Sequence, residues 1–215
     1  MNKKLLLSIP AITIAMSLHA MAERVIVGNF STGDLNGWEP KSFKGETHYT
    51  LTDNRGNKVL KAESNNSASG MVREIKIDLK QTPFLHWSWK TEDVFEDVNE
   101  RTKEGDDYPA RVYVVFSGGL FFWKTRAINY VWSSNQPLGS SWPNAFTSNA
   151  RMIAVESGNA KTGEWINERR NVLADFRQLF HEEPGSVDAI AIMTDTDNSG
   201  QSAISWYGDI WFSSK

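Results

Sequence analysis

The residues with the clearest chemical potential lie near the C-terminus, where side chains with oxygen ligands alternate along the chain. Asp195, Asp197 and Ser199 occupy every second position, and Gly200 follows them. Oxygen ligands at this spacing before a glycine turn suit a hard cation, so the segment is a candidate site for a structural calcium ion. An EF-hand is excluded because the twelfth position of its loop, which needs Glu, falls on Trp206.

The same segment also fits a purely structural role. Residues 197–200 read Asp-Asn-Ser-Gly, and Asn and Gly readily adopt the positive φ of a tight turn. We therefore predict a hairpin between strands at 187–193 and 204–212, with or without a bound ion. Asp209 in the last strand is a further metal candidate, because its carboxylate would meet the N-terminal strand across a shared cation. Alternation places Tyr207, Asp209 and Trp211 on one face of this strand and Ile204, Trp206, Ile210 and Phe212 on the buried face.

A second group of titratable side chains lies in an acidic segment, residues 92–107. Eight of these residues are acidic and two are basic, and charge runs of this kind are usually solvated loops. Asp106 and Asp107 differ from the others because they adjoin a predicted strand that starts at Arg111. In that place they can anchor the loop through Arg111, receive the hydroxyl groups of a ligand, or act as acid and base in glycoside cleavage.

Candidate ligand-binding side chains follow from alternation in the predicted central strands. Arg111 and Tyr113 share the face opposite Val112, Val114 and Phe116, so we expect them to line an exposed or concave surface together with Asn129. Trp132 and Trp142 lie at or beyond strand ends among small polar residues, where indole rings can stack on sugars. The alternative is that these two rings close the ends of the core.

The N-terminus has the pattern of a secretory signal. Lys3 and Lys4 precede an apolar run over residues 5–18, and residues 20–22 read Ala-Met-Ala, the small residues of a cleavage site. Because the run is shorter than the roughly 20 residues that span a bilayer, we predict a cleaved signal peptide over residues 1–22 and a mature chain from Glu23. The expected location is the bacterial periplasm or the medium, with no transmembrane segment after cleavage.

Composition narrows the class of protein further. The net charge is −3, whereas proteins that bind nucleic acid are usually basic. We therefore exclude nucleic acid as a partner. Cysteine is absent, so an exported chain must depend on a packed core rather than on disulfides. The sequence also lacks the Gly-x-Ser-x-Gly elbow, the P-loop, the Rossmann glycine pattern and His-Glu-x-x-His, so the catalytic residues of any reaction are unknown.

Short β-rich runs separated by Gly, Asn, Asp and Pro predict one all-β domain over residues 23–215. The architecture that fits is a β-sandwich or jelly roll with one short helix near residues 164–180, where apolar residues recur at helical spacing. The predicted strands cover residues 25–30, 47–52, 59–63, 71–78, 84–90, 111–116, 127–133, 152–157, 187–193 and 204–212.

Several segments carry a resemblance to known families. Residues 30–38 and 206–210 resemble the opening turn and the closing strand of galactose-binding-like jelly rolls, whose termini lie near each other and often share a calcium ion. Ser31 departs from that pattern, because an acidic residue commonly stands there. Segments 105–116, 129–134, 139–144 and 193–198 together resemble DUF3047, a bacterial exported domain of unknown function. This resemblance covers nearly the whole mature chain and implies no established activity.

These features favour an exported, non-catalytic protein that binds a carbohydrate or an envelope polymer. The expected contacts come from Asp106, Asp107, Arg111, Tyr113, Asn129, Trp132 and Trp142. One alternative is a glycan-cleaving enzyme, a hydrolase or lyase, which would pair Asp106 or Asp107 with a distant carboxylate such as Glu156 or Asp195. The other alternative is a structural or assembly protein of the cell envelope.

Overall fold

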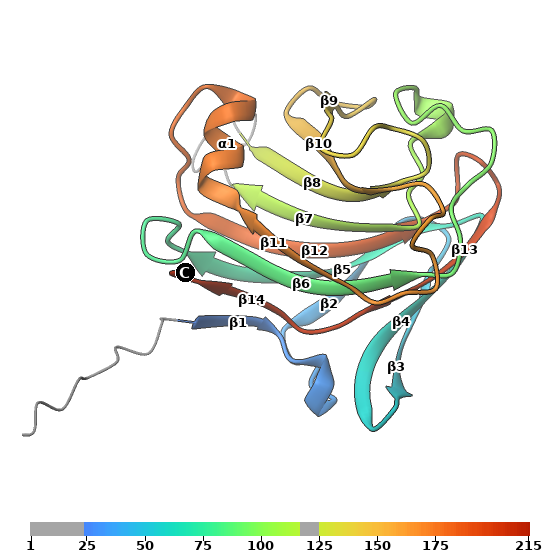
Figure 1. Cartoon of the computed structure of the whole chain (residues 1–215), viewed down its shortest axis with the longest axis horizontal. Helices are drawn as coiled ribbons and strands as arrows, with labels where there is room; N and C mark the ends of the chain where they lie inside the picture. The colour runs from blue at the N-terminus through green and yellow to red at the C-terminus, as the bar shows by residue number, and fades with distance from the viewer. Residues whose placement is uncertain (1–23, 117–124) are drawn as a thin grey trace, which may run out of the picture.

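The computed structural model describes residues 24–116 and 125–215 and consists of two β-sheets that enclose a core (Figure 1). The described residues form fourteen strands and one α-helix. The predicted all-β sandwich is therefore confirmed. The predicted signal peptide, residues 1–22, and the predicted first mature residue, Glu23, lie outside the described residues.

The first sheet has β6 at its centre. One edge of β6 pairs with β11, and its other edge pairs with β13 and β14 in succession. The sheet is completed by β1 beside β14 and by β4 and β3 beyond β13. The bounds are β1 (Arg24–Gly28), β3 (His48–Asn54), β4 (Asn57–Asn65), β6 (Phe84–Thr91), β11 (Ile166–Asn171), β13 (Ser202–Tyr207) and β14 (Ile210–Ser213).

The second sheet is seven-stranded and has the order β2-β5-β12-β7-β8-β10-β9. All of its neighbouring strands are antiparallel except β8 and β10, which are parallel. Its strands are β2 (Trp38–Lys44), β5 (Ala68–Ile77), β7 (Ala110–Phe116), β8 (Arg126–Ser133), β9 (Ser141–Pro143), β10 (Ala150–Ser157) and β12 (Val187–Asp195).

Aromatic side chains from the two sheets meet in the core. In β6 every second residue is buried, so Leu85, Trp87 and Trp89 point inward, as alternation predicts. The ring of Trp87 lies 5.4 Å from that of Tyr130 in β8, measured between centroids. Trp89 lies 6.0 Å from Trp132 by the same measure. These contacts hold the two sheets together over the centre of the sandwich.

The segment that follows β12 crosses from one sheet to the other. β12 pairs with β5 and β7, whereas β13 pairs with β4 and β6. The predicted hairpin is therefore wrong, because alternation and turn residues look alike for a reversal within a sheet and for a crossing between sheets. The tight turn itself is present: Gly200 has a φ of 68°, and its N–H donates to the carbonyl of Thr196 at 2.9 Å.

The helix is shorter than its sequence pattern predicts. Residues 166–171 form β11, and only Val172–Phe180 form α1. Asn171 begins the helix, since its side chain accepts a hydrogen bond from the N–H of Ala174 at 3.0 Å. The apolar spacing that predicts a helix belongs to residues 172–180 alone. Within the two described ranges, no helix has the length and apolar character needed to cross a bilayer.

The last predicted strand is split by a bulge. Tyr207 pairs with Trp89 and Trp211 pairs with His86, so the C-terminal segment has one residue more than β6 between these pairs. An extra residue reverses which side chains face the core. Tyr207 is accordingly buried and Trp206 is not, contrary to the predicted faces, whereas the predicted burial of Ile210 and Phe212 is confirmed.

Asp209, which belongs to this bulge, connects the N-terminal and C-terminal parts of the described chain. Its Oδ1 accepts the backbone N–H of Ser31 at 2.8 Å, and its Oδ2 accepts the Ser31 hydroxyl at 2.6 Å. Ser31 is the residue that departs from the galactose-binding-like pattern. The serine thus provides a direct contact to Asp209 at the place where an acidic residue would need a cation between two carboxylates.

We expect Asp209→Ala to lower the free energy of unfolding by about 1–2 kcal/mol, because it removes the acceptor of both hydrogen bonds. Ser31→Ala should cost less, since the backbone N–H still donates. Urea unfolding of the single and double variants measures the coupling. The double variant should lose no more than Asp209→Ala alone, and a loss equal to the sum of the two single variants would contradict the direct contact.

Candidate functional site

A cavity of about 430 Å³ lies on the face of the second sheet that points away from the core. Its floor comes from β7, β8 and β12, where Arg111, Tyr113, Asn129 and Met193 alternate with residues of the core. Its volume falls in the range of small-molecule sites. The cavity collects most of the side chains that the sequence singles out: Asp106, Arg111, Tyr113, Asn129, Asp195 and Asp197.

Arg111 is the central cation of this site and is only 3% exposed. Its guanidinium pairs with Asp195, and its Nη1 lies 3.8 Å from Oδ2 of Asp106. The guanidinium carbon also lies 4.9 Å from the ring centroid of Tyr108 and 5.5 Å from that of Tyr113. A buried charge needs such partners, so Arg111 fixes the end of β12 and the loop before β7 relative to each other.

Asp106 anchors a second loop to this network. Both of its carboxylate oxygens accept hydrogen bonds from Nδ2 of Asn144, at 3.1 and 2.9 Å. Burial raises the pKa of the Asp106 carboxyl above its usual range, and Arg111 and Asn144 oppose that rise. Asn144 follows β9, so Asp106 connects the loop after β9 with the floor of the cavity.

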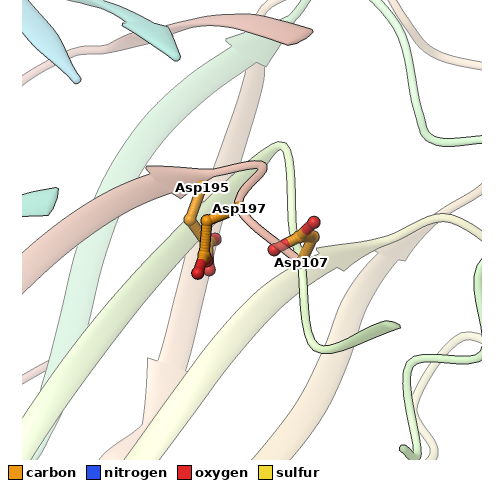
Figure 2. A group of neighbouring side chains, drawn as sticks. All are labelled: Asp107, Asp195 and Asp197. Atoms are coloured by element: carbon orange, nitrogen blue, oxygen red, sulfur yellow. The ribbon is translucent and has the colours of Figure 1, made fainter. Parts of the chain in front are cut away.

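Asp107 forms no ion pair with Arg111 in the described residues and instead accepts hydrogen bonds from the crossing segment. Figure 2 shows it beside Asp195 and Asp197, and carboxylate oxygens of the three residues lie within 4.8 Å of one another. Asp107 accepts the backbone N–H of Ser199 at 2.6 Å, and the single backbone N–H of Asn198 lies 3.2 Å from its Oδ1 and 3.1 Å from its Oδ2. It therefore closes the turn that follows β12, and pinning through Arg111 applies to Asp106 alone.

The structure brings Asp107, rather than Asp209, to the predicted metal ligands. Asp195 accepts the N–H of Tyr108 at 3.2 Å and pairs with Arg111. Asp197 lies 3.7 Å from Nζ of Lys44. Protein cations and N–H donors thus meet much of the negative charge in this cluster. The calcium ion expected from the sequence at Asp195, Asp197 or Asp209 stays a prediction, and Asp107 joins Asp195 and Asp197 as a candidate ligand.

The two tryptophans expected to stack on sugars are buried. Trp132 has no exposed surface and donates through Nε1 to the carbonyl of Gly158 at 3.0 Å. Trp142 is 2% exposed and packs with Tyr108 and Met152 on the outer side of the sheet. The prediction of exposed stacking rings is wrong at both positions, because Trp132 faces the core between the sheets beside Trp89, and Trp142 packs into a smaller buried cluster on the outer side.

Two phenylalanines at the rim take the exposed positions instead. Phe43 in β2 is 72% exposed, and Phe146 in the loop after β9 is 57% exposed. Both line the cavity, one from each end of the strand order of the sheet. Sequence reasoning missed them because each is a single apolar residue in a polar segment. The only signal was an isolated phenylalanine with no periodic apolar neighbours.

Glu156, the distant carboxylate considered for glycan cleavage, belongs to a different cluster. Its Oε1 accepts a hydrogen bond from Nζ of Lys161 at 2.7 Å. Burial and the neighbouring Glu156 raise the pKa of Glu168 in β11 to about 7. Oε1 of Glu168 is buried and has no hydrogen-bond partner among the described residues. The pair lies where the two sheets approach each other, since β10 and β11 belong to different sheets.

Comparison with known proteins gives one family and several distant structures. The model of DUF3047, a protein of unknown function, matches residues 36–211. A CBM29-2 mutant complexed with mannohexaose is 12% identical, with 90% of this chain and 93% of that chain covered and a TM-score of 0.43. A family 29 carbohydrate-binding module gives 12% identity, 90% coverage of both chains and a TM-score of 0.43.

A further similar structure is the Spr0440 glycoside hydrolase domain, Endo-D, from Streptococcus pneumoniae R6. It is 13% identical, with 83% of this chain and 21% of that chain covered and a TM-score of 0.37. No curated relative matches the sequence. At identities and TM-scores of this size, the side chains of the site must carry the functional argument.

We expect millimolar calcium to raise the melting temperature of the metal-stripped protein and not that of Asp197→Asn. Asp197 is the most exposed of the three carboxylates, so its replacement disturbs packing least. An ion that binds only the folded state adds about 2.7 kcal/mol at a hundredfold excess over its Kd. If neither calcium nor chelator changed the melting temperature of the wild type, hydrogen bonds and Arg111 would be sufficient to stabilise the three carboxylates.

The pKa of Glu168 predicts a pH dependence of stability. It is raised from 4.5 to about 7 in the folded chain, so its contribution to stability is full below about pH 4.5 and is lost as the pH rises through about 7. Glu168→Gln removes this titration. At pH 8 we expect the free energy of unfolding of the variant to exceed that of the wild type by about 1–2 kcal/mol. This difference is reduced because Glu168 is only partly buried.

At pH 4 the two proteins should have similar free energies of unfolding in urea. Glu164→Gln is the matched control, because Glu164 is exposed and precedes the same strand. If the free energy of unfolding changed equally with pH in the wild type and in Glu168→Gln between pH 5 and 8, burial would not raise the pKa of Glu168.

Proposed function

The chain belongs to the DUF3047 family, described as proteins of unknown function, and we propose from the geometry of the cavity that it binds a carbohydrate. Asn129 carries the proposal. Its side chain is 1% exposed and lines the cavity, and neither Oδ1 nor Nδ2 has a hydrogen-bond partner among the described residues. A buried amide without partners costs about 1–3 kcal/mol, so Asn129 is built to pair with a bound molecule.

Hydroxyl groups satisfy such an amide well. Each sugar hydroxyl can donate and accept, so two adjacent hydroxyls pair with the acceptor and the donor of Asn129 at once. Tyr113 offers a further hydroxyl beside it, which lies 3.6 Å from the sulfur of Met193, a weak acceptor, and also interacts with Arg111. The floor therefore presents the amide of Asn129 and the hydroxyl of Tyr113 to a bound molecule.

The rim supplies the apolar contact that a sugar ring needs. Phe43 and Phe146 are exposed and line opposite ends of the cavity. The C–H face of a pyranose is apolar and its edge is polar, which matches aromatic rings above a polar floor. Nζ of Lys103 lies 5.4 Å from the ring centroid of Phe146.

The charges of the cavity favour a neutral sugar. Asp106, Asp195 and Asp197 line it together with Lys44 and Arg111, and Arg111 is already paired within the network. A uronic acid would add a further negative charge to this excess of carboxylates. Because residues 1–22 have the pattern of a secretory signal, we propose that the ligand is a neutral polysaccharide of the cell envelope or the medium.

We propose binding without cleavage. Glycoside hydrolysis needs two carboxylates free to reach the scissile bond from both sides. Asp106 is engaged by Asn144 and Arg111, and Asp107 by backbone N–H groups of the crossing segment. These carboxylates serve as anchors of loops, which favours the binding protein over the hydrolase or lyase.

We expect the cavity to bind neutral oligosaccharides on a glycan array and to disfavour uronic acids, so that any binding of uronic acids does not depend on Asn129. Asn129→Ala, Phe43→Ala and Phe146→Ala should each weaken binding about tenfold, which corresponds to roughly 1.4 kcal/mol of lost contact. Leu138→Ala is the matched control, because Leu138 is 64% exposed and does not line the cavity. Calorimetric titration with the strongest neutral oligosaccharide measures each Kd.

Trp132→Ala distinguishes a residue that stabilises the core from residues that bind the ligand. It should lower the free energy of unfolding by about 3–5 kcal/mol, as expected for a buried indole, whereas the two phenylalanine variants should retain wild-type stability. Unchanged Kd values in all three cavity variants would rule out this site. Release of reducing ends by the wild type and not by Asp106→Asn would identify an enzyme instead.

A further inference from the structure

The outer face of the first sheet carries a row of side chains that the cavity does not use. Ile26, Trp211, His86 and Arg169 are consecutive cross-strand neighbours on β1, β14, β6 and β11. Figure 1 shows these strands side by side. Their sequence neighbours Val27, Phe212 and Leu85 are buried, so the row points away from the core.

Aromatic rings in this region hold cations against the sheet. The rings of His86 and Trp211 are parallel within 2°, with centroids 5.1 Å apart. The guanidinium carbon of Arg24 lies 4.0 Å from the centroid of Trp211. On the other side of the row, the guanidinium carbon of Arg169 lies 3.8 Å from the centroid of Phe84. Cation–π contacts at these distances orient the charged groups without neutralising them.

These cations have no acidic partner in the part of the chain that the structure describes. Arg24, Arg169 and Lys90 form none of its ion pairs, whereas Arg111 and Lys44 at the cavity pair with aspartates. Lys90 instead lies 4.0 Å from the ring of Trp206. The row therefore presents positive charge on a protein whose net charge is −3.

His86 reports the same field. Burial lowers the pKa of its imidazole, and the positive charges of Arg169 and Arg24 lower it further. Its Nε2 lies 2.8 Å from Oγ of Ser213. An anion bound across the row would offset the two arginines and raise this pKa.

A second cavity adjoins the row. It has a volume of about 340 Å³ and is lined by two indoles and by neutral polar side chains, among them Trp165, Trp211, Asn54, Asn57 and Ser88. Lys58 contributes a further cation, and Asp209 is engaged by Ser31. Groups of this kind suit the hydroxyls and C–H faces of sugar rings rather than lipid chains.

We propose that this outer face binds an acidic polysaccharide, with Arg24, Arg169 and Lys90 pairing with its anionic groups. Arg24 on β1 and Arg169 on β11 are separated by three strand spacings, which places their strands about 14 Å apart. An extended polymer with charges at intervals spans that distance, and a small anion does not. Arg24, Lys90 and Arg169 lie against the aromatic rings. The surface therefore presents positive charge to a ligand and not the exposed apolar rings that insert into a membrane.

The test uses the protein as it is purified from the cells that produce it, and polygalacturonate is the probe. The double variant Arg24→Gln/Arg169→Gln should bind about tenfold more weakly, as expected for two exposed ion pairs. Lys41→Gln/Lys80→Gln removes the same charge from exposed positions elsewhere and should change the Kd by less than about twofold. Added salt should weaken wild-type binding.

A second readout follows the histidine directly. Titration of the His86 ring by NMR should show a higher pKa with polygalacturonate present than without it. An unchanged His86 pKa, or equal losses of affinity in the double variant and its charge-matched control, would overturn the proposal. Binding to phosphatidylglycerol vesicles in place of polygalacturonate would overturn it in favour of a membrane surface. Asn129→Ala should leave polygalacturonate binding intact, so this proposal and the neutral-sugar cavity fail independently.

Discussion

One buried ion-pair network, centred on Arg111, determines the shape of the outer side of the second sheet. A guanidinium taken out of water is tolerated only with well-placed anions and rings around it, and here Asp106, Asp195, Tyr108 and Tyr113 surround it. Two loops and the end of β12 must therefore stop at fixed places around one side chain. The cavity is the space left between them, and its walls are rigid because the charge cannot be left unpaired.

The same network explains why acidic residues near the cavity are poor candidates for catalysis. Asp106 and Asp195 stabilise Arg111, and Asp107 accepts N–H groups of the segment that crosses between the sheets. Their oxygens are committed to the fold before any ligand arrives. Among the side chains that line the cavity, Asn129 has two buried polar atoms without a hydrogen-bond partner in the described residues, and Arg111 has one, its Nε. A site built in this way is suited to recognition of shape and hydroxyl pattern more than to proton transfer.

Local patterns in the sequence predicted the elements whose two faces differ. Alternation accounts for the burial of Leu85, Trp87 and Trp89, and it placed Arg111 and Tyr113 on one outward face. Alternation failed for β2, because its residues after Trp38 are all exposed. It also failed for β11, because the apolar pattern near that strand belongs to α1, which follows it in the sequence. The meeting of Asp107 with Asp195 and Asp197 depends on how distant loops pack, which no local pattern contains. Phe43 and Phe146 were missed for the related reason that an isolated exposed ring has no periodicity.

The bulge at residues 208–209 affects how members of this family can be compared. Its single extra residue sets Trp211 on the outer face and Ile210 and Phe212 in the core, after Tyr207 has occupied the core side of β13. A relative that lacked this residue would present the opposite set of side chains to solvent while keeping almost the same sequence. An alignment drawn without a gap there would equate inward positions with outward ones. Substitutions that conserve a surface would then be mistaken for substitutions that change it.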